Sequence, residues 1–225
     1  MQFLDEVEMT KYWAKRFRNI ILTGMPGSGK TLFGKIYAQH SERFFLDFDQ
    51  FIESITKKTI PKIFEQEGEE GFRALEDKIL LKLERRHNFV IAMGGGTLTK
   101  HENIDFARKL GLIVHLDLAT NEIANRIFAQ KETRPMFSKC NSVEETLVLV
   151  NELLQKRKSA YEQADVIIDT TYNTMDSLKL HLALIERRAG NREYMQDIYH
   201  IINKRIHPQS KWTEKDEGIV EEITI

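Results

Sequence analysis

Several features are scarce in this sequence of 225 residues, and each scarcity excludes a class of protein. The single cysteine, Cys140, cannot form an intrachain disulfide or a structural zinc site, so we interpret it as a bystander thiol in a reducing compartment. No apolar run reaches the roughly 18 residues that cross a bilayer, so we expect no membrane span. The N-terminal segment MQFLDEVEM carries acids where export and organelle signals carry Lys or Arg, which predicts a cytoplasmic protein.

An excess of charge of either sign is also missing. The 33 Lys and Arg residues oppose 34 Asp and Glu residues, which gives a net charge of −1. Because nucleic acids are bound through clusters of cations, we expect no nucleic-acid partner. The hydrophobic share of 41% is enough to build a core, and the length is that of one α/β domain with appendages.

The central part of the chain alternates short β-branched or aromatic runs with longer helical patterns, which is typical of βαβ units. Ser142 and Glu145 form a capping box that starts one helix. We predict an α/β fold of three layers, with a five-stranded parallel sheet and helices on both faces. The expected strands are 19–23, 44–47, 89–93, 112–117 and 166–169, and the expected helices are 30–39, 70–86, 103–109, 121–129, 143–163 and 175–188.

The two ends differ from the central domain, which we place at residues 18–188. Met9, Trp13 and Phe17 form an apolar stripe at a spacing of four, so the extension 1–17 is expected to be a packed helix. For the extension 189–225 we expect a short helix followed by an acidic tail. Either end could instead be an interaction surface that mediates self-association, although we expect a monomer.

A phosphate-binding loop is indicated by GMPGSGKT, from Gly24 to Thr31, which matches G-x-x-x-x-G-K-[ST] in full. Glycines are required because such a loop wraps its backbone N–H groups around phosphate oxygens, and the following helix points its positive end at them. The alternative is a glycine-rich turn before an ordinary helix. We expect Lys30 to reach the β- and γ-phosphates and the Thr31 hydroxyl to ligate Mg²⁺. The predicted nucleotide contacts are Gly27, Ser28, Gly29, Lys30, Thr31 and Leu32.

Asp47 and Asp49 follow the second expected strand, at the edge where ligands of open α/β sheets bind. The i, i+2 spacing places both carboxylates on one face of a strand, so that one could hold magnesium through water while the other meets an acceptor hydroxyl. The alternative is that Asp49 caps a helix starting at Phe51.

Two further signals are weak when taken singly. Arg73 and Glu76 are spaced to share one helix face, where the acid could orient the base. The glycines 94–96 end the third expected strand, where missing side chains allow a substrate to approach the backbone. An Arg–Glu pair is usually a surface pair and a glycine run is usually a loop, so only their combination is informative.

In chain order, the segments GMPGSGKT, FFLDFDQFIE, IPKIF, GFRALE, MGGGT, KETRPMF and RKSAYEQA resemble the shikimate kinase family over about residues 18–186. Gluconate kinases share the loop but not this series. The resemblance implies a P-loop kinase fold with a mobile lid at about 128–141, and ATP and Mg²⁺ as co-substrate and metal. It also implies transfer of the γ-phosphoryl of ATP to the 3-hydroxyl of shikimate, a step of chorismate and aromatic amino acid biosynthesis.

The same resemblance implies roles for individual residues. Asp49 would meet the acceptor hydroxyl as a base, Lys30 and Arg134 would complete the catalytic set, and Thr31 and Asp47 would hold the metal. Because an ordinary aspartate is a weak base toward an alcohol, we expect Asp49 to accept the proton late. The expected shikimate contacts are Asp49, Phe64, Phe72, Arg73, Gly94, Gly95, Gly96 and Arg157, with Glu76 orienting Arg73 and Arg126 stacking on adenine.

Two alternatives stay open from the sequence. One is another small-acceptor kinase of the same fold, such as a gluconate kinase. The other is a regulatory module that keeps the fold and docks a partner through its extensions, although the intact lysine and arginines argue against it. Met136 and Phe137 depart from the family pattern, in which smaller aliphatics follow the Arg-Pro pair.

Overall fold

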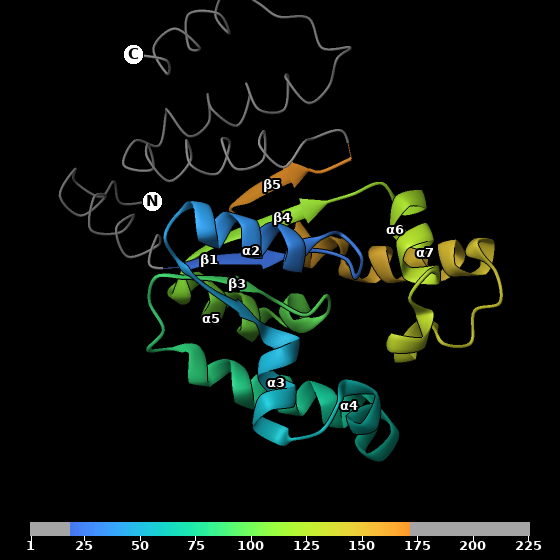
Figure 1. Cartoon of the computed structure of the whole chain (residues 1–225), viewed down its shortest axis with the longest axis horizontal. Helices are drawn as coiled ribbons and strands as arrows, with labels where there is room; N and C mark the ends of the chain where they lie inside the picture. The colour runs from blue at the N-terminus through green and yellow to red at the C-terminus, as the bar shows by residue number, and fades with distance from the viewer. Residues whose placement is uncertain (1–18, 172–225) are drawn as a thin grey trace, which may run out of the picture.

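The computed structural model describes residues 19–171, so the expected segments 1–17, 175–188 and 189–225 lie outside the described residues (Figure 1). Five parallel strands form one sheet in the order β2-β3-β1-β4-β5. All five expected strands are confirmed, and only the third differs, because it ends at residue 92. The bounds are β1 (Asn19–Thr23), β2 (Phe44–Asp47), β3 (Phe89–Ala92), β4 (Leu112–Asp117) and β5 (Val166–Asp169).

Alternate residues of β1 face the two helical layers. Ile20 and Leu22 pack with Phe33 and Tyr37 of α2 (Lys30–His40) in one core cluster. Ile21, between them, packs in a second cluster with residues of α3 (Phe48–Thr56), α4 (Ile60–Leu80) and α5 (His101–Leu110). Both faces of the sheet are therefore covered, which is why its strands are near-continuous apolar runs. The three-layer α/β expectation is confirmed.

The helices surround the sheet, and in Figure 1 the arrowheads of β1 and β4 point toward α6. Ser142 caps α7 as expected, because its hydroxyl accepts the backbone N–H of Glu145 at 3.2 Å. The reciprocal bond differs from the expected capping box, since the Glu145 carboxylate accepts the backbone N–H of Asn141 at 2.8 Å. None of the described helices is long and apolar enough to cross a membrane. The helix bounds are α2 (Lys30–His40), α3 (Phe48–Thr56), α4 (Ile60–Leu80), α5 (His101–Leu110), α6 (Thr120–Phe128) and α7 (Val143–Tyr161).

Two helical segments were missed by the sequence analysis. The expected helix 70–86 is part of α4, which begins at residue 60, is interrupted at Gly68 and ends at residue 80. Gly68 has φ 67° and ψ −173°, a conformation outside the helical region. Helix α3 is capped by Asp47, whose side chain accepts the backbone N–H of Gln50 at 3.2 Å. The alternative that Asp49 caps a helix starting at Phe51 is therefore wrong.

The same cap corrects the geometry expected for the two aspartates. Strand β2 ends at Asp47, and Asp49 lies in the first turn of α3. The strand argument for their shared face is therefore wrong, although both carboxylates line the same cavity. A helix begins here because the Asp47 carboxylate satisfies one of the free N–H groups of the first turn.

Candidate active site

The loop between β1 and α2 has the conformation that its glycines permit. Gly24, Gly27 and Gly29 have φ values of 142°, 82° and 93°, which residues other than glycine rarely adopt. The Nζ of Lys30 donates to the carbonyl oxygens of Gly24 and Met25, each at 2.9 Å. Burial lowers the pKa of Lys30 to about 8, and the nearby Asp49 carboxylate opposes that shift. The ammonium group of Lys30 is therefore held by the loop that precedes it, and the residue lines a cavity that is described below.

The two residues expected to hold a metal are in direct contact. Oγ1 of Thr31 donates to Oδ2 of Asp47 at 2.8 Å. A hydroxyl and a carboxylate suit Mg²⁺, which prefers oxygen ligands and keeps several waters. Within residues 19–171 no group of three or more His, Cys, Asp or Glu side chains could hold a metal ion. The Thr31 hydroxyl and the Asp47 carboxylate would thus suit an ion that takes its remaining ligands from water and phosphate oxygens.

Two cavities meet at the carboxyl edge of the sheet. The larger, of about 850 Å³, is lined by the phosphate-binding loop and by every residue expected to contact the nucleotide. The smaller, of about 390 Å³, is lined by every residue expected to contact the acceptor. Five residues line both cavities and so mark their junction: Pro26, Asp47, Asp49, Gly95 and Arg134.

Asp49 lies at this junction and has altered acidity. Burial raises its pKa to about 6, with further contributions from the charges of Asp47 and Glu76. A Cβ atom built on Gly94 would lie 2.8 Å from Oδ1 of Asp49, so the carboxylate rests directly on that glycine. The higher pKa makes Asp49 a stronger base than the ordinary aspartate assumed from the sequence.

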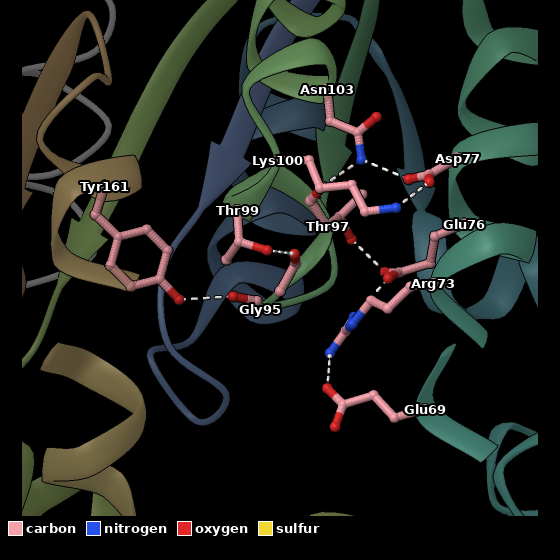
Figure 2. Close-up of polar contacts among 11 residues, drawn as sticks. Glu69, Arg73, Glu76, Asp77, Gly95, Thr97, Thr99, Lys100, Asn103 and Tyr161 are labelled. Carbon is pink, nitrogen blue, oxygen red and sulfur yellow. Dashed lines mark hydrogen bonds and ion pairs between the residues drawn. The ribbon is translucent and has the colours of Figure 1, made fainter. Parts of the chain in front are cut away.

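Arg73 is oriented by two acids and a glycine. Its Nη1 donates to Oε2 of Glu76 at 2.5 Å, and its Nη2 donates to Oε1 of Glu69 at 3.2 Å (Figure 2). A Cβ atom at Gly96 would lie 2.7 Å from Nη2, so the guanidinium extends across the backbone of the glycine loop. The expected Arg73–Glu76 pair is therefore present, with Glu76 only 1% exposed.

The buried Glu76 carboxylate has a second donor that the sequence did not reveal. Oγ1 of Thr97 donates to Oε1 of Glu76 at 2.5 Å. The backbone oxygen of Thr97 in turn accepts from Nδ2 of Asn103, which also donates to Asp77 (Figure 2). The loop that follows β3 is thus tied to α4 and α5.

Two arginines bring buried, unpaired N–H groups to the smaller cavity. Arg157, on α7, is only 5% exposed, and its Nη1 has no hydrogen-bond partner among the described residues. Nε of Arg134 is also buried and has no hydrogen-bond partner among the described residues. Because a buried donor without a partner is costly, these groups are suited to an anionic ligand.

The segment expected to be a lid contains two short 3-10 turns, η3 (Lys131–Thr133) and η4 (Pro135–Phe137), with Arg134 between them. Phe137 is buried in a cluster with α6 and α7, and Met136 packs against that cluster. The larger side chains at these positions are therefore accommodated. Arg126 donates from Nη1 to the Gly27 carbonyl at 3.3 Å, beside the loop, and its stacking on adenine stays a prediction.

Some lining residues were missed. Ile60 and Pro61 line the smaller cavity, and they lie in the IPKIF segment, of which only Phe64 was expected to contact the acceptor. Thr170 lines the larger cavity directly after β5, where the rule for open sheets could have found it.

Comparison with known proteins decides the family. A family model for shikimate kinase matches residues 26–203. The chain belongs to the shikimate kinase family. Shikimate kinase from Parasynechococcus marenigrum is 37% identical over 151 residues, which are 67% of this chain and 76% of that protein. The enzyme from Caldanaerobacter subterraneus is 37% identical over 161 residues, which are 72% and 91% of the two chains.

Solved shikimate kinases share the fold. The Acinetobacter baumannii enzyme, in complex with shikimate, has a TM-score of 0.68 and 32% identity, covering 79% of this chain and 96% of that one. The Bacteroides thetaiotaomicron enzyme has a TM-score of 0.70 and 30% identity, covering 75% and 98%. The expected fold, family and enzyme class, an ATP-dependent kinase, are thus confirmed.

Proposed function

We propose that this shikimate kinase transfers the γ-phosphoryl of ATP to the 3-hydroxyl of shikimate, giving shikimate 3-phosphate and ADP. The observation that carries the proposal is the junction of the two cavities. ATP would occupy the larger cavity with its γ-phosphate toward Asp49 and Arg134, and shikimate the smaller one with its hydroxyl toward the same residues.

Shikimate would be held at its carboxylate by Arg73 and Arg157, both of which line the smaller cavity. A guanidinium matches a carboxylate in two parallel hydrogen bonds. Glu76 fixes one edge of Arg73, and the unpaired Nη1 of Arg157 offers a donor. Phe64 and Phe72 would wall the ring, and their own rings are 4.8 Å apart. The glycines 94–96 would let the substrate approach the backbone.

Asp49 would accept the proton of the attacking hydroxyl, since burial raises its pKa to about 6. Phosphoryl transfer has a loose transition state with charge on the equatorial oxygens, so cations and positioning supply most of the catalysis. Lys30 and Arg134, which both line the larger cavity, would supply those cations. Closure of the segment 128–141 as a lid would exclude water from the phosphoryl group.

Thr31 and Asp47 would hold Mg²⁺ at the phosphate-binding loop, and the bound ion would neutralise charge on the β- and γ-phosphates. Their contact of 2.8 Å supports this placement. The nucleotide would also contact Gly27, Ser28, Gly29 and Leu32.

The test is ADP release from the purified chain with ATP and Mg²⁺, with and without shikimate, and with gluconate or a nucleoside monophosphate in its place. We expect turnover that depends on shikimate, and a loss of about 100-fold or more in Asp49→Asn with ATP binding retained. Equal turnover with gluconate would indicate the alternative kinase. No acceptor-dependent turnover at all would indicate a regulatory module.

The domain division, the monomeric state and the cytoplasmic location are further proposals. A chain truncated to residues 18–188 should keep its activity if both extensions are appendages. Light scattering of the full chain tests the monomer, and self-association that is lost in the truncated form would assign that role to the extensions.

A further inference from the structure

Tyr161 is the last residue of α7, and its hydroxyl reaches two loops at once. The side chain is only 3% exposed. The hydroxyl donates to the carbonyl oxygen of Gly95 at 2.7 Å, as Figure 2 shows. It also lies 3.6 Å from Sδ of Met25 in the phosphate-binding loop. One phenol therefore connects the glycine loop after β3 with the loop after β1.

These two loops touch each other at the junction of the cavities. A Cβ atom built on Gly95 would lie 2.8 Å from Cδ and 3.1 Å from N of Pro26. Pro26 and Gly95 both line the two cavities. A shift of the Gly95 peptide would therefore change the distance between a ligand in the nucleotide cavity and a ligand in the acceptor cavity.

Tyr161 is itself held firmly. Its ring packs on the imidazole of His115 in β4, with ring centroids 4.5 Å apart. Burial lowers the pKa of His115 to about 4, so the imidazole is neutral. Burial also raises the pKa of Tyr161, and the neighbouring Arg157 opposes that shift only in part, so the phenol stays a donor.

We propose that Tyr161 is a positioning residue, whose hydroxyl fixes the Gly95 peptide against the phosphate-binding loop and so sets the distance between donor phosphoryl and acceptor hydroxyl. The inference rests on the proposed function. Transfer between two bound reactants is sensitive to their separation, and a displacement of about 1 Å can cost about 100-fold in rate. A tyrosine that only fills the core would affect stability without this effect on the rate.

The test is Tyr161→Phe, which keeps the ring and its packing on His115 and removes the hydroxyl. We expect kcat for shikimate-dependent ADP release to fall by about tenfold or more, because the reactants are no longer aligned. The KM for ATP should be unchanged, and so should any hydrolysis of ATP without shikimate. The hydroxyl meets the phosphate-binding loop at Sδ of Met25, whereas Lys30 is held by the carbonyl oxygens of Gly24 and Met25.

The matched control is Tyr37→Phe, which removes the hydroxyl of another buried tyrosine, in α2 and outside both cavities. Both variants are compared by thermal melting, and kinetics are measured below both melting temperatures. We expect similar small losses in Tm and a fall in kcat for Tyr161→Phe alone.

Three results would overturn the inference: unchanged kcat in Tyr161→Phe, a parallel fall in the acceptor-free ATP hydrolysis, or a rise in the KM for shikimate alone. The last would mean that Tyr161 acts through Arg157. The parent chain is assayed first, so absence of shikimate-dependent turnover there would count against the proposed function instead.

Discussion

The Arg73 guanidinium and the Glu76 carboxylate form a 2.5 Å ion pair in which the arginine is partly open to the acceptor cavity and the acid is buried. Glu76 thus holds the guanidinium of Arg73 on its buried side, and the side of the guanidinium that lines the acceptor cavity is left for a ligand. Removing one partner of such a pair leaves a buried charge without compensation. The pair is therefore informative only when it is tested through a change that keeps both charges.

Thr97 offers such a change, since its hydroxyl donates to the other oxygen of Glu76. Thr97→Val keeps the shape but leaves that oxygen with one donor fewer, which should cost about 1–3 kcal/mol in the free energy of unfolding. Arg73 should lose orientation, so we expect a higher KM for shikimate with the KM for ATP unchanged. Steady-state kinetics and urea denaturation measure these effects.

Thr97→Ser is the control, because it retains the hydroxyl and loses only a methyl group. We expect it to restore most of the affinity for shikimate. Equal defects in the two variants would show that packing of the methyl group, and not the hydrogen bond to Glu76, is responsible.

The pH dependence of the reaction should follow Asp49. Burial raises its pKa to about 6, and the base must be deprotonated, so kcat/KM for shikimate should fall as the pH drops below about 6. Asp49→Asn removes the titrating group, so its residual activity should show no acid limb near pH 6. A limb that stays in place in this variant would assign the titration to another group.

Asp49 should also lower the stability of the protein at neutral pH. Its pKa is 3.8 in the unfolded reference and about 6 in the folded chain, so the folded state holds the extra proton between these values and stability falls as the pH rises through them. Asp49→Asn should therefore be more stable than the parent at pH 7, by about 2–3 kcal/mol. Urea denaturation should show this gain shrinking toward pH 4. A constant difference would mean that ionisation is not its cause.

Arg134 should act on the rate more than on nucleotide binding. It lines both cavities, and burial lowers its pKa while Asp49 opposes that shift. Arg134→Ala should reduce kcat by about 1,000-fold, as for other arginines that contact a transferring phosphoryl group, with ATP affinity nearly intact. Arg126→Ala is the comparison, because it should weaken ATP binding if Arg126 stacks on adenine. An unchanged kcat in Arg134→Ala would contradict the assignment.

The elements that the sequence predicted well are those with a local signal. The phosphate-binding loop is specified by contiguous glycines and a lysine, and the five strands by short apolar runs between turns. The helix cap at Ser142 is equally local. Helix α3 and the start of α4 were missed because each is a short segment, one beginning directly after β2 and the other ending at the non-helical Gly68.

The amino-acid sequence by itself determined the family, the five strands and most of the chemically active residues around both cavities, because these follow from spacing along the chain. Only the tertiary structure decided how the residues act together. The pairs Thr97–Glu76 and Tyr161–Gly95 are 21 and 66 residues apart, so no local pattern reports them. The acidity of Asp49 was likewise decided by folding, because burial beside two other carboxylates changes the free energy of its charged form.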